Sequence, residues 1–234
     1  MRKYCVIGAR SGSEAIVDKN IKKIDGQPLL SLCIKKAIKC DIYDQIYVSS
    51  DSVFYRDFLP KNTNVKFVLR PIEISHSDST EIEYLSHVIE TKNLKEDSLI
   101  ARMQCTSPFQ SIVSMKTAVK KLETDFTKFD SVQLVSPSSP SIHKAMLKCE
   151  KSGLLSPATD LGSIGPSNRQ DLVQTYFRSN FYVTSVQQIL LGSLLGSRSY
   201  GLKCKDREGL DIDTQFDLEV VRALAILNAE WLIT

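Results

Sequence analysis

The chain has 234 residues with 42% hydrophobic content, enough to bury one substantial core, so we expect a single domain over residues 1–234. Its 30 Lys and Arg residues against 27 Asp and Glu residues give a net charge of +3, too small for a nucleic-acid-binding surface. No apolar run approaches the roughly 18 residues that cross a bilayer, and the six cysteines form no C-x-x-C pair. We expect a reduced, cytoplasmic protein with no nucleic-acid partner and no membrane partner.

Short apolar runs alternate with helix-like segments along most of the chain, which predicts an α/β fold with a parallel sheet. The strands are predicted at residues 3–7, 45–49, 65–69, 98–103, 131–135 and 181–184. The helices are predicted at residues 28–39, 53–59, 81–90, 112–122, 187–195 and 215–231. Ligands of open α/β sheets bind outside the carboxyl ends of the strands. The loops expected to converge there are 8–20, 49–51, 70–80 and 104–110.

A turn-rich section interrupts this alternation at residues 136–168, where Pro, Gly and Ser are frequent. A section of this length without periodicity is typical of a substrate lid or of an arm that packs on a partner subunit. A plain surface excursion is the alternative. The pattern alone does not decide between a lid or arm and a surface excursion.

A polar loop at residues 9–14, followed by Lys19 and Asn20, comes directly after the first predicted strand. Its small residues allow backbone N–H groups to approach phosphates, and Arg10 and Lys19 supply the positive charge that an oligophosphate requires. Neither the dinucleotide-binding nor the P-loop glycine signature is present. Taken alone, the loop is therefore only a polar turn.

Two carboxylates, Asp211 and Asp213, stand on either side of Ile212 just before the last predicted helix. In extended backbone, residues two apart project to the same face, so both carboxylates can grip one hard cation. Mg²⁺ prefers carboxylate and phosphate oxygens, and this pair facing a triphosphate loop would make a nucleotidyl-transfer site. The alternative is that Asp213 or Thr214 merely caps the helix.

Other polar residues follow the remaining strands. The neutral amide of Gln104 can bind a sugar hydroxyl or a base edge, although the residues after it also suit a simple turn. Arg70 with Ser79 and Thr80 can hold a base or ribose, although Ser79 or Thr80 equally suits a helix cap. The histidines are too scattered for a metal site.

Five motifs appear in order along the chain. They are Ala9-Arg10-x-x-Ser13 with Lys19-Asn20, Arg70-Pro71-x-Glu73, Gln104-x-Thr106-Ser107-Pro108, Arg169-Gln170-Asp171-Leu172 and Asp211-Ile212-Asp213-Thr214. Together they resemble the acylneuraminate cytidylyltransferases, the CMP-sialic acid synthetases, from about residue 3 to residue 226. The resemblance implies a three-layer, Rossmann-like nucleotidyltransferase fold with a mostly parallel central sheet and a small dimerisation arm at about 136–168.

The resemblance also implies an enzyme, a homodimer that transfers CMP from CTP to an acidic nine-carbon sugar and releases pyrophosphate. Mg²⁺ would arrive with CTP rather than be tightly bound. The implied catalytic residues are Arg10, Lys19, Asp211 and Asp213, of which Asp211 and Asp213 are the metal ligands. The implied nucleotide-binding residues are Ala9, Arg10, Ser13, Lys19, Asn20, Arg70, Ser79 and Thr80. The implied sugar-binding residues are Gln104, Lys144, Arg169 and Tyr182.

The chain departs from the family pattern on its substrate loops. Glu14 stands where the family usually has Lys, Gln110 where it has Arg, and Gly8 and Ser11 replace Pro and Gly. A reversed charge beside a triphosphate weakens binding unless the side chain turns outward or joins the metal shell. Two alternatives therefore remain. One is CMP transfer to an eight-carbon acidic sugar or another polysaccharide precursor, and the other is a catalytically weakened nucleotide-binding relative.

Overall fold

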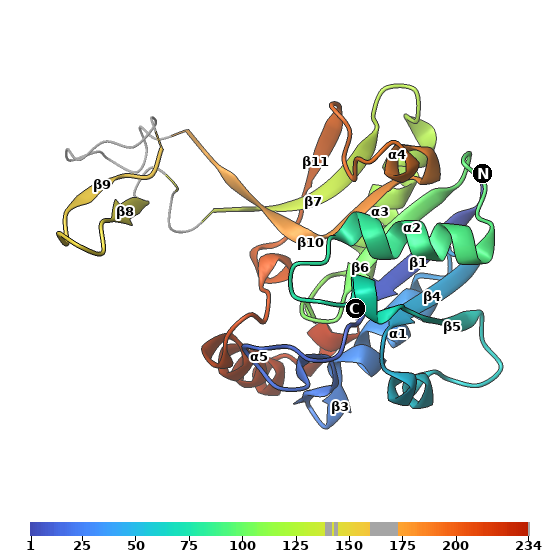
Figure 1. The fold of residues 1–234 in the computed structure, drawn as a ribbon, viewed down its shortest axis with the longest axis horizontal. Helices are drawn as coiled ribbons and strands as arrows, with labels where there is room; N and C mark the ends of the chain where they lie inside the picture. The colour runs from blue at the N-terminus through green and yellow to red at the C-terminus, as the bar shows by residue number, and fades with distance from the viewer. Residues whose placement is uncertain (139–141, 143–144, 160–172, 234) are drawn as a thin grey trace.

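The computed structural model of this chain describes residues 1–138, 142, 145–159 and 173–233. Within these residues, a seven-stranded sheet has the order β11-β7-β10-β6-β1-β4-β5 (Figure 1). Its strands are β1 (Lys3–Gly8), β4 (Gln45–Ser50), β5 (Val65–Leu69), β6 (Leu99–Gln104), β7 (Ser131–Pro137), β10 (Tyr176–Ser185) and β11 (Ser199–Lys203). β10 is antiparallel to both neighbours and every other pair is parallel, so the predicted, mostly parallel sheet is confirmed.

Helices cover both faces of the sheet, which makes three layers. The α-helices are α1 (Leu29–Cys40), α2 (Glu81–Lys92), α3 (Ile112–Thr124), α4 (Val186–Leu190) and α5 (Gln215–Leu227). Along β1, Cys5 and Ile7 pack in the core cluster that contains α1 and α3, and Tyr4 and Val6 pack in the cluster that contains α2 and α4. Because both faces are covered, β1 is a continuous apolar run rather than an alternating one.

Shorter elements connect these layers. The 3-10 helices are Lys19–Ile21, Val53–Phe58, Ile72–Ile74, Asp206–Gly209 and Ala229–Leu232. A two-stranded sheet of β2 (Lys23–Ile24) and β3 (Gln27–Pro28) precedes α1. Neither β2 nor β3 was predicted, since strands this short leave no apolar pattern.

Two helices are shorter than predicted. The helix expected over residues 187–195 ends at Leu190, and Gly192 follows in the left-handed region at φ 78°. The helix expected over residues 215–231 ends at Leu227, because Asn228 leaves the helical region at φ −146°. The chain then continues as a separate 3-10 helix, so Trp231 does not belong to α5.

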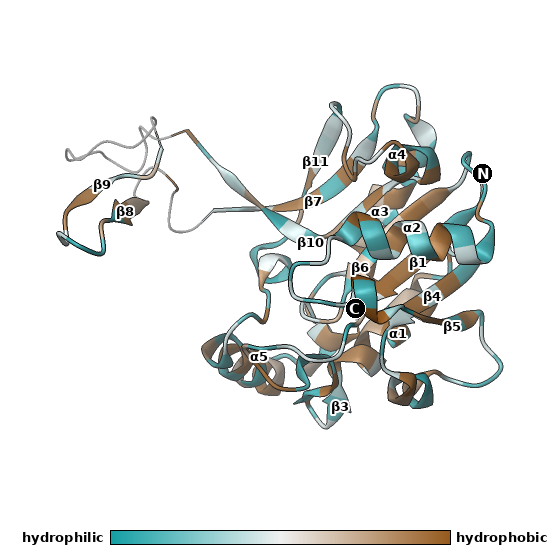
Figure 2. Ribbon diagram, in the orientation of Figure 1, coloured by the Kyte–Doolittle hydropathy of each residue, from teal (hydrophilic) through white to brown (hydrophobic). Residues whose placement is uncertain are grey.

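β7 and β10 run past the sheet as a ribbon that carries an arm, shown at the left of Figure 1. The arm contains a hairpin of β8 (Met146–Lys148) and β9 (Leu155–Pro157), which corrects the prediction of an irregular section there. Hydrophobic colour marks both strands of this hairpin in Figure 2, and Leu147 and Leu155 are exposed. The dimerisation function expected for this section stays a prediction.

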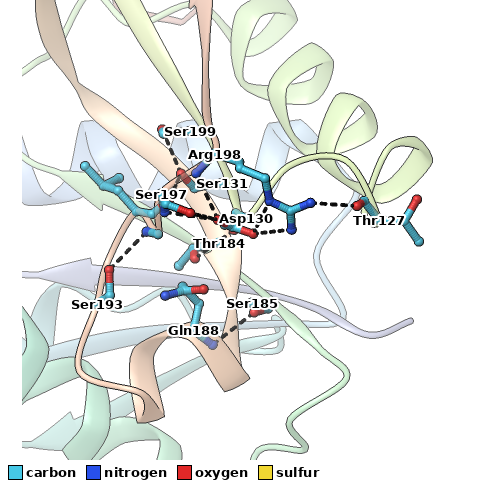
Figure 3. A network of polar contacts seen from close by, with 12 residues as sticks. Thr127, Asp130, Ser131, Thr184, Ser185, Gln188, Ser193, Ser197, Arg198 and Ser199 are labelled. Carbon is cyan, nitrogen blue, oxygen red and sulfur yellow. Dashed lines mark hydrogen bonds and ion pairs between the residues drawn. The ribbon is translucent and has the colours of Figure 1, made fainter.

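At the amino end of β7, opposite the crevice side of the sheet, Asp130 ties down the loop that leads into β11 (Figure 3). Its carboxylate accepts hydrogen bonds from the backbone of Ser197 and Arg198 at 3.1 and 2.9 Å and from the Arg198 guanidinium at 2.6 Å. A Cβ on Gly196, at φ 66°, would lie 2.4 Å from Asp130 Cβ. The loop therefore requires glycine at this position.

Candidate active site

A cleft of about 370 Å³ opens at the carboxyl ends of β1 and β6. The predicted site residues that line it are Arg10, Ser13, Lys19, Asn20, Arg70, Ser79, Gln104, Asp211 and Asp213. They come from loops at both ends of the chain and at its centre, as expected for the crevice of an open α/β sheet.

Lys19 joins the first loop to the carboxylate pair. Its Nζ donates hydrogen bonds to the Ile212 carbonyl at 2.8 Å and to Asp213 Oδ1 at 3.2 Å. The Asn20 side chain donates to the Arg10 carbonyl at 2.8 Å and so connects the end of the first loop to its beginning. The first loop and residues 211–213 thus face each other across the cleft.

The start of this loop has a structural function. Ala9 is fully buried and donates its N–H to the Ser49 carbonyl at 2.9 Å, so it extends the pairing of β1 and β4 and does not line the cleft. Ser11 donates its N–H to Asp51 Oδ1 at 2.7 Å, and its hydroxyl donates to the other carboxylate oxygen. These contacts anchor the bend from which Arg10 and Ser13 project.

The carboxylate pair has the predicted alternation. Ile212 is fully buried and its N–H donates to the Thr106 carbonyl at 3.0 Å, which ties the pair to the loop after β6. Asp211 Oδ1 accepts a hydrogen bond from Ser107 at 3.2 Å, and the Asp213 side chain is 74% exposed. Both carboxylates line the cleft and Ile212 points into the core.

The helix-cap alternative is correct for Thr214, which is the N-cap of α5 and forms a capping box with Asp217. Asp213 is not the cap, since its side chain accepts from Lys19 and, like Asp211, lines the cleft. In the described part of the chain, no group of three or more His, Cys, Asp and Glu side chains could hold a metal. Two carboxylates suit a Mg²⁺ ion that takes its other ligands from phosphates and water.

The predicted base and ribose residues divide between the cleft and a helix cap. Arg70 is buried with its guanidinium 4.3 Å from the centre of the Tyr84 ring, and burial lowers its pKa. Ser79 lines the cleft. Thr80 does not, because its hydroxyl caps α2 by accepting from the Glu83 N–H at 3.3 Å.

A buried lysine supports the loop that carries Gln104. Lys36 Nζ donates to the carbonyls of Pro108 and Gln110, both at 2.6 Å, and to that of Trp231 at 3.1 Å. Burial lowers the pKa of Lys36 to about 8. The helix pattern of α1 gave no sign of this function, because a lysine on a helix is usually solvated.

A second cavity of about 200 Å³ adjoins the cleft, and Tyr182 lines it rather than the cleft itself. The two cavities share Glu81, Arg102 and Asn180. The cleft residues that sequence reasoning did not assign to the site include His76, Glu81, Tyr84, Arg102 and Asn180. Arg102 had a visible signal, since it is a charged residue inside a strand predicted to be buried. Lys144 and Arg169, predicted for the sugar side, lie outside the described residues.

A family model described as Cytidylyltransferase matches residues 4–151. The chain belongs to this family. Over 224 residues, the chain is 27% identical to an N-acylneuraminate cytidylyltransferase of Streptococcus agalactiae serotype V, with 93% of this chain and 52% of that protein covered. The chain thus spans about half the length of this relative. The predicted resemblance to the acylneuraminate cytidylyltransferases is confirmed.

Two further proteins widen the comparison. The chain is 28% identical over 146 residues to a Helicobacter pylori protein named pseudaminic acid cytidylyltransferase and UDP-2,4-diacetamido-2,4,6-trideoxy-beta-L-altropyranose hydrolase, covering 62% of this chain and 28% of that protein. The structure of a CMP:2-keto-3-deoxy-manno-octonic acid synthetase complexed with CTP superposes with a TM-score of 0.68 at 14% identity, covering 97% and 100% of the two chains. This likeness confirms the predicted Rossmann-like fold. None of the helices within the described ranges is long and apolar enough to cross a membrane.

The residues at which this chain departs from the family pattern lie in different places relative to the cleft. Glu14 is exposed and is not among the cleft-lining residues. Gly8 does line the cleft, and a Cβ there would lie 3.0 Å from the Tyr84 ring, so the small residue accommodates Tyr84. Gln110 is buried and donates to Ser179 at 3.0 Å, away from the cleft lining.

Proposed function

We propose that this protein is an enzyme that transfers CMP from CTP to an acidic nine-carbon sugar, sialic acid or a related nonulosonic acid, and releases pyrophosphate. The observation that carries the proposal is the contact of Lys19 with Ile212 and Asp213. It puts a phosphate-binding cation beside a carboxylate pair that suits a hard metal ion. The names of the relatives supply the substrate class.

In the proposed reaction, the sugar hydroxyl attacks the α-phosphorus of CTP and pyrophosphate leaves. Arg10 and Lys19 lie where they can offset the negative charge of the triphosphate and of the leaving group. Asp211 and Asp213 would hold Mg²⁺ arriving with CTP. Bound there, Mg²⁺ would neutralise phosphate charge and orient the displacement. Either a carboxylate of the pair or a water accepts the sugar proton.

The two substrates divide between the adjoining cavities. We assign CTP to the cleft, which Arg10, Lys19 and Arg70 line, and the sugar to the side of Gln104 and the second cavity of Tyr182. Lys144 and Arg169 remain predicted contacts of the acidic sugar.

The proposed enzyme is a cytoplasmic homodimer. All six cysteines are free thiols, in keeping with a reducing compartment. The arm exposes Leu147, Leu154 and Leu155, which are 59%, 72% and 59% exposed, and a second copy of the chain would cover them.

The test is pyrophosphate release from CTP and Mg²⁺ with a panel of sialic acid, legionaminate, pseudaminate and 3-deoxy-octulosonate. We expect turnover with a nine-carbon acid. Selective use of the octulosonate would support the eight-carbon alternative, and no turnover with any sugar would contradict the proposal. Calorimetry that detects CTP binding without turnover would support the weakened relative.

Asp211→Asn tests the metal assignment. Electrostatic stabilisation of a transition state is worth about 10²–10³ in rate, so we expect at least this loss in kcat with an unchanged circular dichroism spectrum. Asp130→Asn is the matched control, since Asp130 stabilises the loop before β11 at the other end of the sheet and does not line the cleft. It should lower Tm and spare kcat. If Asp211→Asn behaves as this control does, the carboxylate pair is only structural.

A further inference from the structure

Arg102 is a buried cation in the middle of an apolar strand. It is 3% exposed, and its neighbours on β6, Ala101 and Met103, are buried in the core. Its Nη2 pairs with Glu81 at the start of α2, and its Nη1 donates to the Asn180 carbonyl at 3.2 Å. The guanidinium therefore connects β6 with α2 and β10 at the wall that both cavities share.

Glu81 is held in the same wall from its other side. Its Oε1 accepts from Arg102, and its Oε2 accepts from the Tyr182 hydroxyl at 2.8 Å. Burial, with Tyr84 and Glu81 nearby, raises the pKa of Tyr182 well above its usual range, so the phenol stays protonated and remains a donor. The Glu81 side chain is 33% exposed, so the carboxylate is accessible from the cavities.

Stability alone gives little reason for this arrangement. Burying the Arg102 guanidinium costs desolvation, and an apolar residue of similar volume is commonly as stable. A leucine at position 102 would match its neighbours on β6. The pair also does not fill the space between the two cavities, since both Arg102 and Glu81 line each of them.

The pair still has hydrogen-bonding capacity to offer. Each terminal nitrogen of Arg102 carries more than one N–H, and within the described residues each has a single hydrogen-bond acceptor. Each Glu81 oxygen likewise keeps a lone pair beyond the bond that it accepts. Because the two charges cancel, the wall favours a neutral group that both donates and accepts, rather than a further charge.

We propose that Arg102 and Glu81 are the specificity-determining pair for the acceptor sugar, and that they bind an uncharged hydroxyl or acylamino substituent where the cavities meet. This inference rests on the proposed function, because it places the sugar across the two cavities. The Tyr182 hydroxyl positions Glu81 for this contact. The carboxylate of the sugar would bind elsewhere, since Arg102 is already neutralised.

The test compares wild type, Arg102→Met and Glu81→Gln. Each is assayed with N-acetylneuraminate and with analogues that lack one hydroxyl or the acylamino group. For Arg102→Met we expect the KM for the sugar to rise about 10-fold to 100-fold while the KM for CTP changes less than about 2-fold. Wild type should discriminate against one analogue, and Arg102→Met should lose that discrimination, because the group that read the substituent is gone.

Two variants keep the result interpretable. Arg198→Met removes a guanidinium from another Arg–carboxylate pair, with Asp130, outside the lining of both cavities, and should leave both KM values unchanged. If Arg102→Met does not fold, Tyr182→Phe, which removes only the hydroxyl bonded to Glu81, should still raise the sugar KM by about 3-fold to 10-fold.

Unchanged sugar KM and unchanged discrimination in folded Arg102→Met, or in Tyr182→Phe if the former does not fold, would overturn the proposal. Wild-type turnover in the same assays would leave the proposed function standing. If wild type neither turns over nor binds any acidic sugar by calorimetry, both proposals fail.

Discussion

Individual lysines connect the two ends of the chain at the candidate active site. Lys19 donates to the Ile212 carbonyl at 2.8 Å, and Lys36 donates to the Trp231 carbonyl at 3.1 Å. Lys19 thereby places the carboxylate pair, and Lys36 supports the loop of Gln104 from beneath. Arg102 and Glu81 add a polar wall between the two cavities. At this scale, long side chains act together with backbone pairing, such as the bond from Ile212 N–H to the Thr106 carbonyl, to assemble the site.

Glu14→Lys should raise the affinity for CTP. Glu14 is exposed on the loop that carries Arg10 and does not line the cleft, so its negative charge acts on a triphosphate only through solvent. We expect Kd for CTP to fall by about 2-fold to 5-fold at low salt and the gain to shrink in high salt. Isothermal titration calorimetry measures it, with the exposed Glu219→Lys on α5 as control. A marked loss of affinity would show that Glu14 is itself a ligand.

At the scale of elements, the two ends of the strands have different surroundings. The carboxyl ends carry the polar loops of the cleft, whereas the amino end of β7 is tied to the start of β11 by Asp130. Hydrogen bonds from the Arg198 side chain and backbone hold the pKa of Asp130 below its usual value. A carboxyl whose pKa is lower in the folded protein contributes stability that is lost when it is protonated.

Asp130→Asn should therefore destabilise the protein in a pH-dependent way. At pH 7 we expect Tm to fall by about 2–6 °C, since charge-assisted hydrogen bonds are weakened. The difference from wild type should stay constant down to about pH 4, the pKa of an unperturbed Asp, and shrink below it. Thermal denaturation between pH 3 and 7 tests this, with exposed Asp57→Asn as control. A difference that does not change with pH would contradict the electrostatic account.

At the scale of the whole molecule, a three-layer body carries an arm on the extensions of β7 and β10 (Figure 1). The register of β10 against β7 shifts between Arg178 and Tyr182, where the ribbon leaves the sheet. Tyr182 therefore sits at the base of the arm, in the second cavity. An arm with exposed leucines at its end and a site at its base would let a partner subunit reach the sugar side of the site.

Leu147→Asp combined with Leu155→Asp should convert the proposed dimer to a monomer. Both side chains are exposed on the arm hairpin, so the charges should spare the fold of the body and oppose burial against a second copy. Sedimentation velocity gives the assembly state. Leu191→Asp, an equally apolar site on the body that is 72% exposed, should leave the dimer intact. A monomeric wild type, or a dimeric double variant, would contradict the proposed arm interface.

The strands and helices of the body were largely predictable because their signals are local. β1, β4 and β6 are mostly buried runs of nearly the expected length, β5 is a partly exposed edge strand with the expected bounds, and α1 to α3 fall within two residues of their predicted starts and ends. β11 was missed because its residues alternate between exposed and half-buried, and β8 and β9 because they are short and exposed. Edge and arm strands form through partners that local periodicity does not reveal.

The sequence by itself determined which residues suit phosphates and a metal, because motif chemistry and order along the chain are local facts. Its resemblance to the family predicted that Arg10, Lys19 and the Asp211 and Asp213 pair share one site, and all four line the cleft. The tertiary structure alone decided that Ala9 and Thr80 serve strand pairing and a helix cap. It also revealed the contact of the buried Arg102 with the partly exposed Glu81 where two cavities meet, since such contacts depend on distances across the sheet that residue types do not encode.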